Sequence, residues 1–213
     1  MINKYLAWLA GLVLASTAAA QIVPVENLKP PAASTKAPPY YPLTNRQRWE
    51  WVIGSTLGPE SLAAGLFTAG LGTASDSPVE YGPHWDGFAK RYGMRLTGIS
   101  TGKTIEAGIG SLWNEDPRYF RASGQPFKMR LKNVMVMTFA ARRWEGTLAP
   151  AYARYIGNAG SSFLSNTWRV DSQTQVSDAC SRIAMGFVGK IASNAFAEFW
   201  PDARKHIFHK KKR

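Results

Sequence analysis

The chain has a single cysteine, Cys180, so it cannot form an intramolecular disulfide and its fold must depend on packing alone. It also has no uninterrupted apolar run of the roughly 20 residues that a membrane-spanning helix needs. Acidic residues are scarce: 14 Asp and Glu stand against 26 Lys and Arg, giving a formal net charge of +12. The small neighbours Ala179 and Ala184 predict that Cys180 is a buried structural thiol rather than a nucleophile.

The first 20 residues have the three-part pattern of a secretory signal peptide. Lys4 supplies the positive start, and an apolar run follows from Tyr5 to Ala15. Small residues then precede a cleavage site that we expect between Ala20 and Gln21. We therefore expect the protein to be secreted to the periplasm or the cell envelope. The 193 residues that remain (213 − 20) are enough for about one domain with its own core.

Composition divides the remaining chain into a linker, a domain and a tail. Six prolines among residues 21–43 predict an extended tether, and residues 44–203 form the expected helical domain. The tail, 204–213, contains six Lys or Arg and no acid. A basic exported protein meets anionic lipid headgroups or acidic cell-wall polymers rather than nucleic acid. We expect the tail to bind such a surface through Arg204, Lys205, Lys210, Lys211, Lys212 and Arg213; a tail that only maintains solubility is the alternative.

Helix signals are clear in the first part of the domain. Thr44 and Gln47 have the spacing of a capping box, and Gly58-Pro59 marks the end of one helix and the start of the next. Residues 61–75 carry no charge and contain three glycines, which is typical of a helix that packs closely against another. We interpret the helix at 59–75 as a buried core element, with insertion into a membrane as the alternative.

The rest of the domain also has helical periodicity. A stripe of apolar residues with steps of three or four extends from Trp85 to Leu112, and Asn114 to Pro117 should stop that helix. Further helices are expected over 128–143, with Leu131, Val134, Met135, Thr138 and Phe139 facing inward, from Pro150 to Trp168, and over 176–200, which Pro201 should end. No alternation of period two is long enough for a sheet. The sequence therefore predicts an all-α bundle of six or seven helices, some of them glycine-rich.

Two adjacent carboxylates, Glu115 and Asp116, are the candidates for catalysis. They lie at the predicted helix break, and a carboxyl group with a raised pKa can protonate a glycosidic oxygen. Adjacent side chains seldom point the same way, so a partner such as Glu106, Asp86 or Glu145 would have to come from elsewhere in the fold. The competing interpretation, which we favour, is an ion pair with Arg118, Arg121 or an arginine of the preceding helix. We therefore expect a non-enzymatic protein, with a glycan-cleaving hydrolase that uses Glu115 or Asp116 as the alternative.

Two further motifs, one typical of phosphate binding and one of metal binding, lack residues that such sites need. The segment 101–104 (TGKT) lacks the glycine five positions before Gly102 that a phosphate-binding loop has, and it follows a helix rather than a strand. His206 and His209 have the spacing of a ligand pair, but no third strong ligand lies near them on a rigid element. We accordingly expect no cofactor, no metal ion and no nucleotide.

Arginine stands beside an aromatic residue throughout the chain. Such pairs suit a boundary between apolar and anionic phases, because the ring packs while the guanidinium group binds phosphate or carboxylate. They also suit the rim of an ordinary helical core. Both interpretations remain open for Arg48-Trp49, Arg91-Tyr92, Arg118-Tyr119, Phe120-Arg121, Arg143-Trp144, Arg154-Tyr155 and Trp168-Arg169.

Two strings, WDGFAKRYGMR at 85–95 and EDPRYF at 115–120, resemble those of a group of uncharacterised exported bacterial proteins. The resemblance covers roughly residues 80–200. It implies an exported helical protein, and it brings neither an activity nor a catalytic residue with it. Gly102 departs from the more helix-favouring residue of the group, which leaves the continuity of that helix open.

Overall fold

The computed structural model describes residues 40–209; the predicted signal peptide, residues 21–39 of the linker and residues 210–213 of the tail lie outside this range. The described chain is mostly helical and includes a small antiparallel sheet, which confirms the helical class. Its helices are α2 (Asn45–Leu57), α3 (Pro59–Ala74), α4 (Trp85–Leu112), α5 (Phe127–Phe139), α6 (Tyr152–Leu164) and α7 (Val176–His209).

The predicted helix boundaries at the start of the domain are confirmed. The Thr44 hydroxyl accepts a hydrogen bond from the Gln47 backbone N–H, and the Gln47 side chain accepts one from the Thr44 backbone N–H. Gly58 ends α2, and Pro59 occupies the first turn of α3. The helix that contains Gly102 is continuous, and it ends before Asn114, which has a φ of 59°.

Three short strands form a sheet that the sequence did not predict. They are β1 (Glu115–Asp116), β2 (Ala140–Arg143) and β3 (Leu148–Pro150), in the order β1-β2-β3. The expectation of a domain without a sheet was therefore wrong, as was that of a helix continuing to Arg143. Strands of two to four residues are too short to show an alternating pattern, and Gly146 provides the positive φ of 78° that the turn between β2 and β3 requires.

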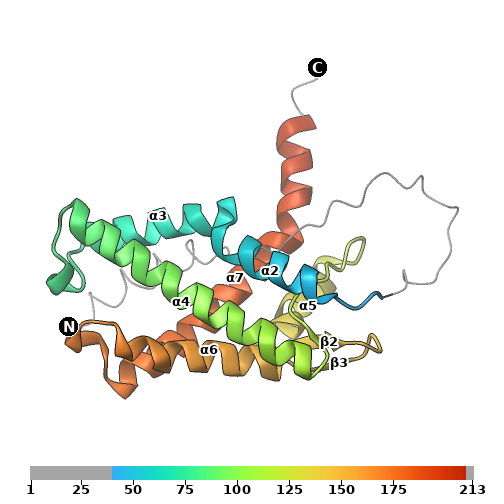
Figure 1. Cartoon of the computed structure of the whole chain (residues 1–213). Helices are drawn as coiled ribbons and strands as arrows, with labels where there is room; N and C mark the ends of the chain where they lie inside the picture. Colours follow the sequence, from blue (N-terminus) through green and yellow to red (C-terminus); the bar gives the residue numbers. More distant parts are fainter. Residues whose placement is uncertain (1–39, 210–213) are drawn as a thin grey trace, which may run out of the picture.

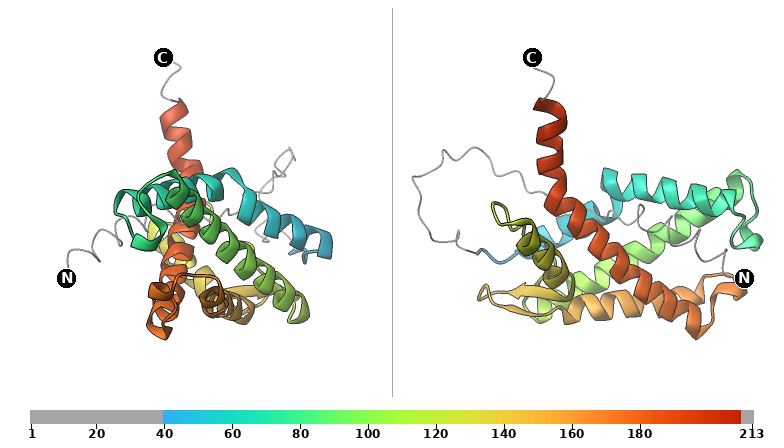
Figure 2. Two further views of the ribbon diagram at one scale, coloured as in Figure 1. Left: turned by 60° about the vertical axis from the view of Figure 1, so that its left-hand side comes forward. Right: turned by 180° about the vertical axis from the view of Figure 1, so that it is seen from behind.

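Helix α7 does not end at Pro201, as the sequence predicted, but continues to His209. The predicted boundary between domain and tail at residue 203 therefore lies inside this helix. Proline lacks an N–H group and its ring crowds the preceding turn, so an uninterrupted helix at this point requires a bend. Figures 1 and 2 show α7 bending in its C-terminal half, where it projects away from the other helices. In the same turn the carbonyl of Glu198 accepts hydrogen bonds from the side chains of Arg121 and Arg130.

Among the described helices, α4 and α6 make the most extensive contact with each other, and they lie side by side (Figure 1). Helices α2 and α3 pack on α4, whereas α7 packs on α5 and α6 (Figure 2). Helices α4 and α6 approach so closely at Gly102 and Gly157 that a Cβ atom on Gly157 would lie 2.8 Å from the Gly102 carbonyl oxygen. Among residues 40–209, no helix has both the length and the apolar character that crossing a membrane requires.

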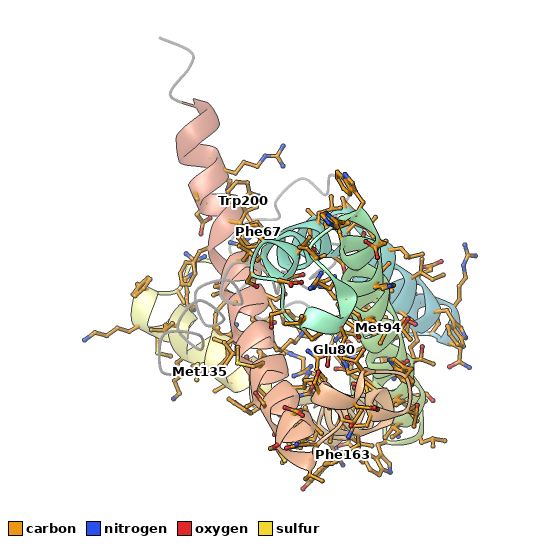
Figure 3. The ribbon with its side chains drawn as sticks, turned by 90° about the vertical axis from the view of Figure 1, so that its left-hand side faces the viewer. Phe67, Glu80, Met94, Met135, Phe163 and Trp200 are labelled. Atoms are coloured by element: carbon orange, nitrogen blue, oxygen red, sulfur yellow. The ribbon has the colours of Figure 1, made fainter. Side chains whose placement is uncertain are left out.

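Small and polar residues, rather than large apolar ones, occupy the buried face of several helices. On α3 the buried residues are Ser61, Ala64, Gly65 and Ala69, while Leu66, Phe67 and Leu71 are exposed. Figure 3 shows Phe67, Met135 and Phe163 on different sides of the body. The expected burial was therefore wrong for Leu131, Met135, Phe139 and the thiol of Cys180. The two ends of the apolar stripe on α4, Trp85 and Leu112, are 83% and 79% exposed.

Candidate functional site

The described structure brings three carboxylates together where α4, β1 and α6 meet. Glu106, Glu115 and Asp116 line one cavity with Arg154, so Glu106, a partner that the sequence had suggested, does join the predicted pair. The other two suggested partners, Asp86 and Glu145, are exposed elsewhere on the molecule. The cavity measures about 10 Å³, which is room for about one water molecule.

Asp116 is fully engaged by its neighbours. Its carboxylate accepts hydrogen bonds from Tyr40 Oη (2.9 Å), from Arg118 Nη2 (2.7 Å) and from the Arg118 backbone N–H (2.9 Å). The side chain is 1% exposed, so the ion pair with Arg118 that the sequence suggested is a buried one. Burial and the adjacent Asp116 carboxylate both raise the pKa of Tyr40, which therefore stays protonated and continues to donate.

Glu115 connects three elements and keeps one oxygen unpaired. Its Oε2 atom accepts a hydrogen bond from the backbone N–H of Ala153 (3.0 Å), in the first turn of α6, where the helix dipole favours a negative charge. Its backbone carbonyl accepts one from Arg48 Nη1 (2.8 Å) of the buried face of α2. Within residues 40–209, Oε1 of Glu115 has no hydrogen-bond partner, although the residue is only 2% exposed.

Glu106 is surrounded by positive charge. Its two oxygens accept hydrogen bonds from Lys103 Nζ (2.9 Å) and Arg154 Nε (3.0 Å). Burial alone would raise the pKa of Glu106, but the charges of Lys103, Arg154 and Lys190 outweigh it and lower the pKa to about 2. Burial, together with Arg154 and Lys103, holds the pKa of Lys190 well below its usual value. A carboxyl group this acidic remains ionised and cannot serve as a general acid.

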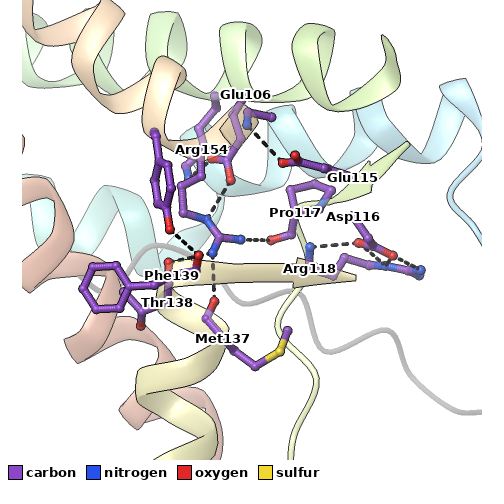
Figure 4. Close-up of polar contacts among 12 residues, drawn as sticks. Glu106, Glu115, Asp116, Pro117, Arg118, Met137, Thr138, Phe139 and Arg154 are labelled. Atoms are coloured by element: carbon purple, nitrogen blue, oxygen red, sulfur yellow. Dashed lines mark hydrogen bonds and ion pairs between the residues drawn. The ribbon is translucent and has the colours of Figure 1, made fainter. Parts of the chain in front are cut away.

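Arg154 is the central cation of the cavity wall. Besides Glu106, its guanidinium group donates to the backbone carbonyls of Met137 and Thr138, both at 2.8 Å, and these carbonyls belong to the last turn of α5 (Figure 4). A positive charge at the carboxyl end of a helix is favourable. Arg154 of α6 thus holds α4 and α5 in place. Of the Arg154-Tyr155 pair noted in the sequence, the arginine is buried in the interior.

A fourth buried carboxylate, Glu198 of α7, organises the segment between β1 and α5. It accepts hydrogen bonds from Tyr119 Oη (2.6 Å), the Ala122 backbone N–H (3.1 Å) and Arg130 Nε (2.7 Å). Burial alone would raise the pKa of Glu198, but these donors lower it. Arg130 also pairs with Asp202 at 2.6 Å.

These contacts describe a structural network rather than an acid–base pair. Asp116 and Glu106 have their oxygens paired with cations, and the cavity beside Glu115 has no space for a sugar ring. Within the described part of the chain, no three His, Cys, Asp or Glu residues are grouped in a way that would hold a metal ion. The arrangement binds α2, α4, α5, α6 and the sheet to one another.

Of the residues predicted to bind a surface, the structure describes the side chains of Arg204 and Lys205, which are exposed on the projecting part of α7. Lys210, Lys211, Lys212 and Arg213 lie outside the described residues. Sequence reasoning missed most of the buried network: Tyr40, Arg48, Arg154, Lys190 and Glu198 were not identified as partners of the acidic pair or of one another. The only hint of these contacts in the sequence is its excess of basic over acidic residues, and this excess does not show which residues pair.

Comparison with known proteins gives no further identification. No family model, no curated protein and no solved structure matches the chain.

Proposed function

We propose that this chain is an exported, non-catalytic helical protein of the cell envelope that attaches peripherally to an anionic membrane surface. In this proposal a leader (1–20) is removed on export, residues 21–43 act as a tether, and the helical domain begins at residue 44 and includes the whole of α7. The observation that carries the proposal is that large apolar side chains are exposed while the carboxylates Glu106, Glu115, Asp116 and Glu198 are buried. Several of the exposed apolar residues adjoin a basic residue in the sequence: Trp49, Phe127, Met129, Leu131 and Trp144.

The charge distribution supports an anionic partner. The chain carries a formal net charge of +12, and four of its 14 acidic residues are buried against arginines or helix ends, where they contribute little negative potential at the surface. Three arginines, Arg48, Arg91 and Arg154, are buried as well, so the exterior keeps a basic excess close to that of the whole composition. Exposed apolar side chains next to lysine and arginine are what an interfacial protein presents to lipid headgroups and the acyl chains below them.

The geometry of the acidic pair does not favour the glycan-cleaving alternative. Hydrolysis of a glycosidic bond needs two carboxyl groups on either side of a bound sugar, one of them protonated. Asp116 is bonded to Arg118 and Tyr40, and Glu106 has a pKa of about 2. Glu115 alone has an unpaired oxygen, in a cavity of about 10 Å³.

The proposal is tested by co-sedimentation of the mature chain with vesicles of phosphatidylglycerol and, separately, of phosphatidylcholine. We expect binding to the anionic vesicles at low salt and a marked loss of binding at 1 M salt, where the Debye length falls to about 3 Å. Equal binding to both lipids, unchanged by salt, would overturn the proposal. Binding to isolated acidic cell-wall polymer but not to phosphatidylglycerol would instead identify the wall as the partner.

A further inference from the structure

We infer that the exposed side of α5 is the part of this protein that enters the lipid headgroup region, an inference that rests on the proposed attachment to an anionic membrane. We call the four residues Phe127, Leu131, Met135 and Phe139 the α5 face. The occupant of this face is an anionic lipid surface.

The α5 face is a continuous apolar stripe. Its members are four residues apart, so each lies about 40° around the helix from the one before, and together they cover about 120° of it. All four are exposed: Phe127 is 66% exposed and the other three between 42% and 46%. The buried residues Val134, Met137 and Thr138 are centred about 90° around the helix from the middle of this stripe and pack inward. An apolar stripe this wide normally faces a core.

Contacts between rings extend the α5 face beyond its own helix. The Phe127 ring lies 5.3 Å from that of Phe199 on α7, and the Phe139 ring lies 5.5 Å from that of Phe187. From Phe187 the series continues to Tyr155 at 5.8 Å, then to Tyr152 at 6.2 Å and to Trp113 at 6.1 Å. Phe187, Phe199 and Tyr155 are half-buried, whereas Tyr152 and Trp113 at the end of the series are exposed. Exposed apolar patches mark interaction surfaces, and Trp and Tyr are the residues that favour the membrane interface.

The charges around the α5 face argue for an anionic lipid rather than another protein copy. Lys128 and Lys132 are exposed on the same helix, which has no acidic residue. The whole segment 117–144 contains seven Lys or Arg and no acid. Two such faces brought together would place like charges in contact, whereas lipid headgroups neutralise them. The third cation of α5, Arg130, is already paired with Glu198 and Asp202, so the free positive charge comes from the lysines.

Helix α3 provides a matched control surface. Leu66 and Phe67 are 55% and 42% exposed, close to the values of 46% and 42% for Leu131 and Met135. Residues 61–75 carry no charge of either sign. If exposed apolar area alone determined binding, substitutions on α3 and α5 would have equal effects; if the combination of apolar and basic residues determines it, only those on α5 matter.

The experiment measures vesicle binding of the mature chain and three variants with phosphatidylglycerol vesicles, each variant first checked for native helicity by circular dichroism. We expect Leu131→Gln/Met135→Gln to weaken binding at least tenfold and Leu66→Gln/Phe67→Gln to leave it within twofold of the unmodified chain. We expect Lys128→Gln/Lys132→Gln to weaken binding at low salt and to make it less dependent on salt.

The outcomes separate this inference from the proposed function. If the unmodified chain binds the anionic vesicles but the α5 variant binds equally well, or the α3 variant loses as much, the assignment of the α5 face is overturned and surface attachment stands. If the unmodified chain does not bind, the proposed function itself fails. A dimer in size-exclusion chromatography that Leu131→Gln/Met135→Gln converts to a monomer would show that the α5 face binds a second copy, which also overturns the inference.

Discussion

Replacement of Arg154 by methionine tests whether the buried polar network holds the helices together. Arg154 is 5% exposed, and the substitution removes its bond to Glu106 and its bonds to the carbonyls of Met137 and Thr138. Loss of one partner of a buried ion pair costs about 3–5 kcal/mol, because the other charge stays buried without compensation. Lys103 still contacts Glu106, which favours the lower part of that range. We expect a loss of about 3–4 kcal/mol from a total stability of order 5–15 kcal/mol.

The assay is urea unfolding of the full mature chain, followed by circular dichroism and analysed by linear extrapolation. Arg154→Lys keeps the positive charge but loses the planar guanidinium group that donates to several acceptors at once, so we expect a smaller loss of stability, about 2 kcal/mol. If Arg154→Met does not fold, this variant still provides a free energy of unfolding. Arg46→Met is the control, because Arg46 pairs with Glu50 at 2.8 Å on the exposed side of α2 and should contribute less than about 0.5 kcal/mol. A loss below about 1 kcal/mol for Arg154→Met, or one no larger than that of the control, would refute the reasoning.

Two further predictions concern acid stability and helix packing. The pKa of Glu106 is about 2 in the folded chain against 4.5 for a free glutamate, so its contribution, of order 3 kcal/mol, is complete above pH 4.5 and disappears as the pH falls towards 2. Unfolding measured between pH 5 and 2 should therefore lose stability less steeply in Glu106→Gln than in the unmodified chain, and parallel profiles would contradict this. A Cβ atom at Gly157 would lie 2.8 Å from the Gly102 carbonyl oxygen, so Gly157→Ala should lower stability by about 1–3 kcal/mol. The same change at Gly70, which has nothing within 4 Å of the new Cβ, should raise stability by about 0.5–1 kcal/mol, and urea midpoints that move in the same direction for both would count against the argument.

Local signals in the sequence were reliable where a few neighbouring residues decide the outcome. The capping box at Thr44, the change of helix at Gly58 and Pro59, and the end of α4 before Asn114 are all present in the structure. The close helix packing expected of the glycines in α3 is present at Gly65, where a Cβ atom would lie 2.7 Å from the Tyr92 ring, and at Gly72, where it would lie 3.0 Å from the Arg91 side chain, but not at Gly70. The cap, the change of helix and the helix end depend on backbone geometry within one or two turns, whereas the packing of α3 depends on its contact with α4.

The sequence failed where distant residues decide the outcome. Periodicity assumes that apolar residues face inward, yet on α4 the buried positions include Arg91 and Glu106 while Trp85 is exposed. Which charges can be buried depends on partners that the fold supplies from far along the chain, as with Tyr40 and Asp116, which are separated by 76 positions. The ion pair between Asp116 and Arg118 could be predicted because the two residues are neighbours, but the remaining contacts of the site could not.

The contacts of Glu198 make the order of a whole connection depend on one distant side chain. Residues 117–126, between β1 and α5, have no helix or strand of their own, and Tyr119, Arg121 and Ala122 all bond to the side chain or carbonyl of Glu198. Substitutions at positions 119 and 121 are therefore tolerated only where the new side chain still donates a hydrogen bond to Glu198. Protection of its backbone from proteases depends on a position almost eighty residues away, which sequence inspection of the connection itself would not reveal.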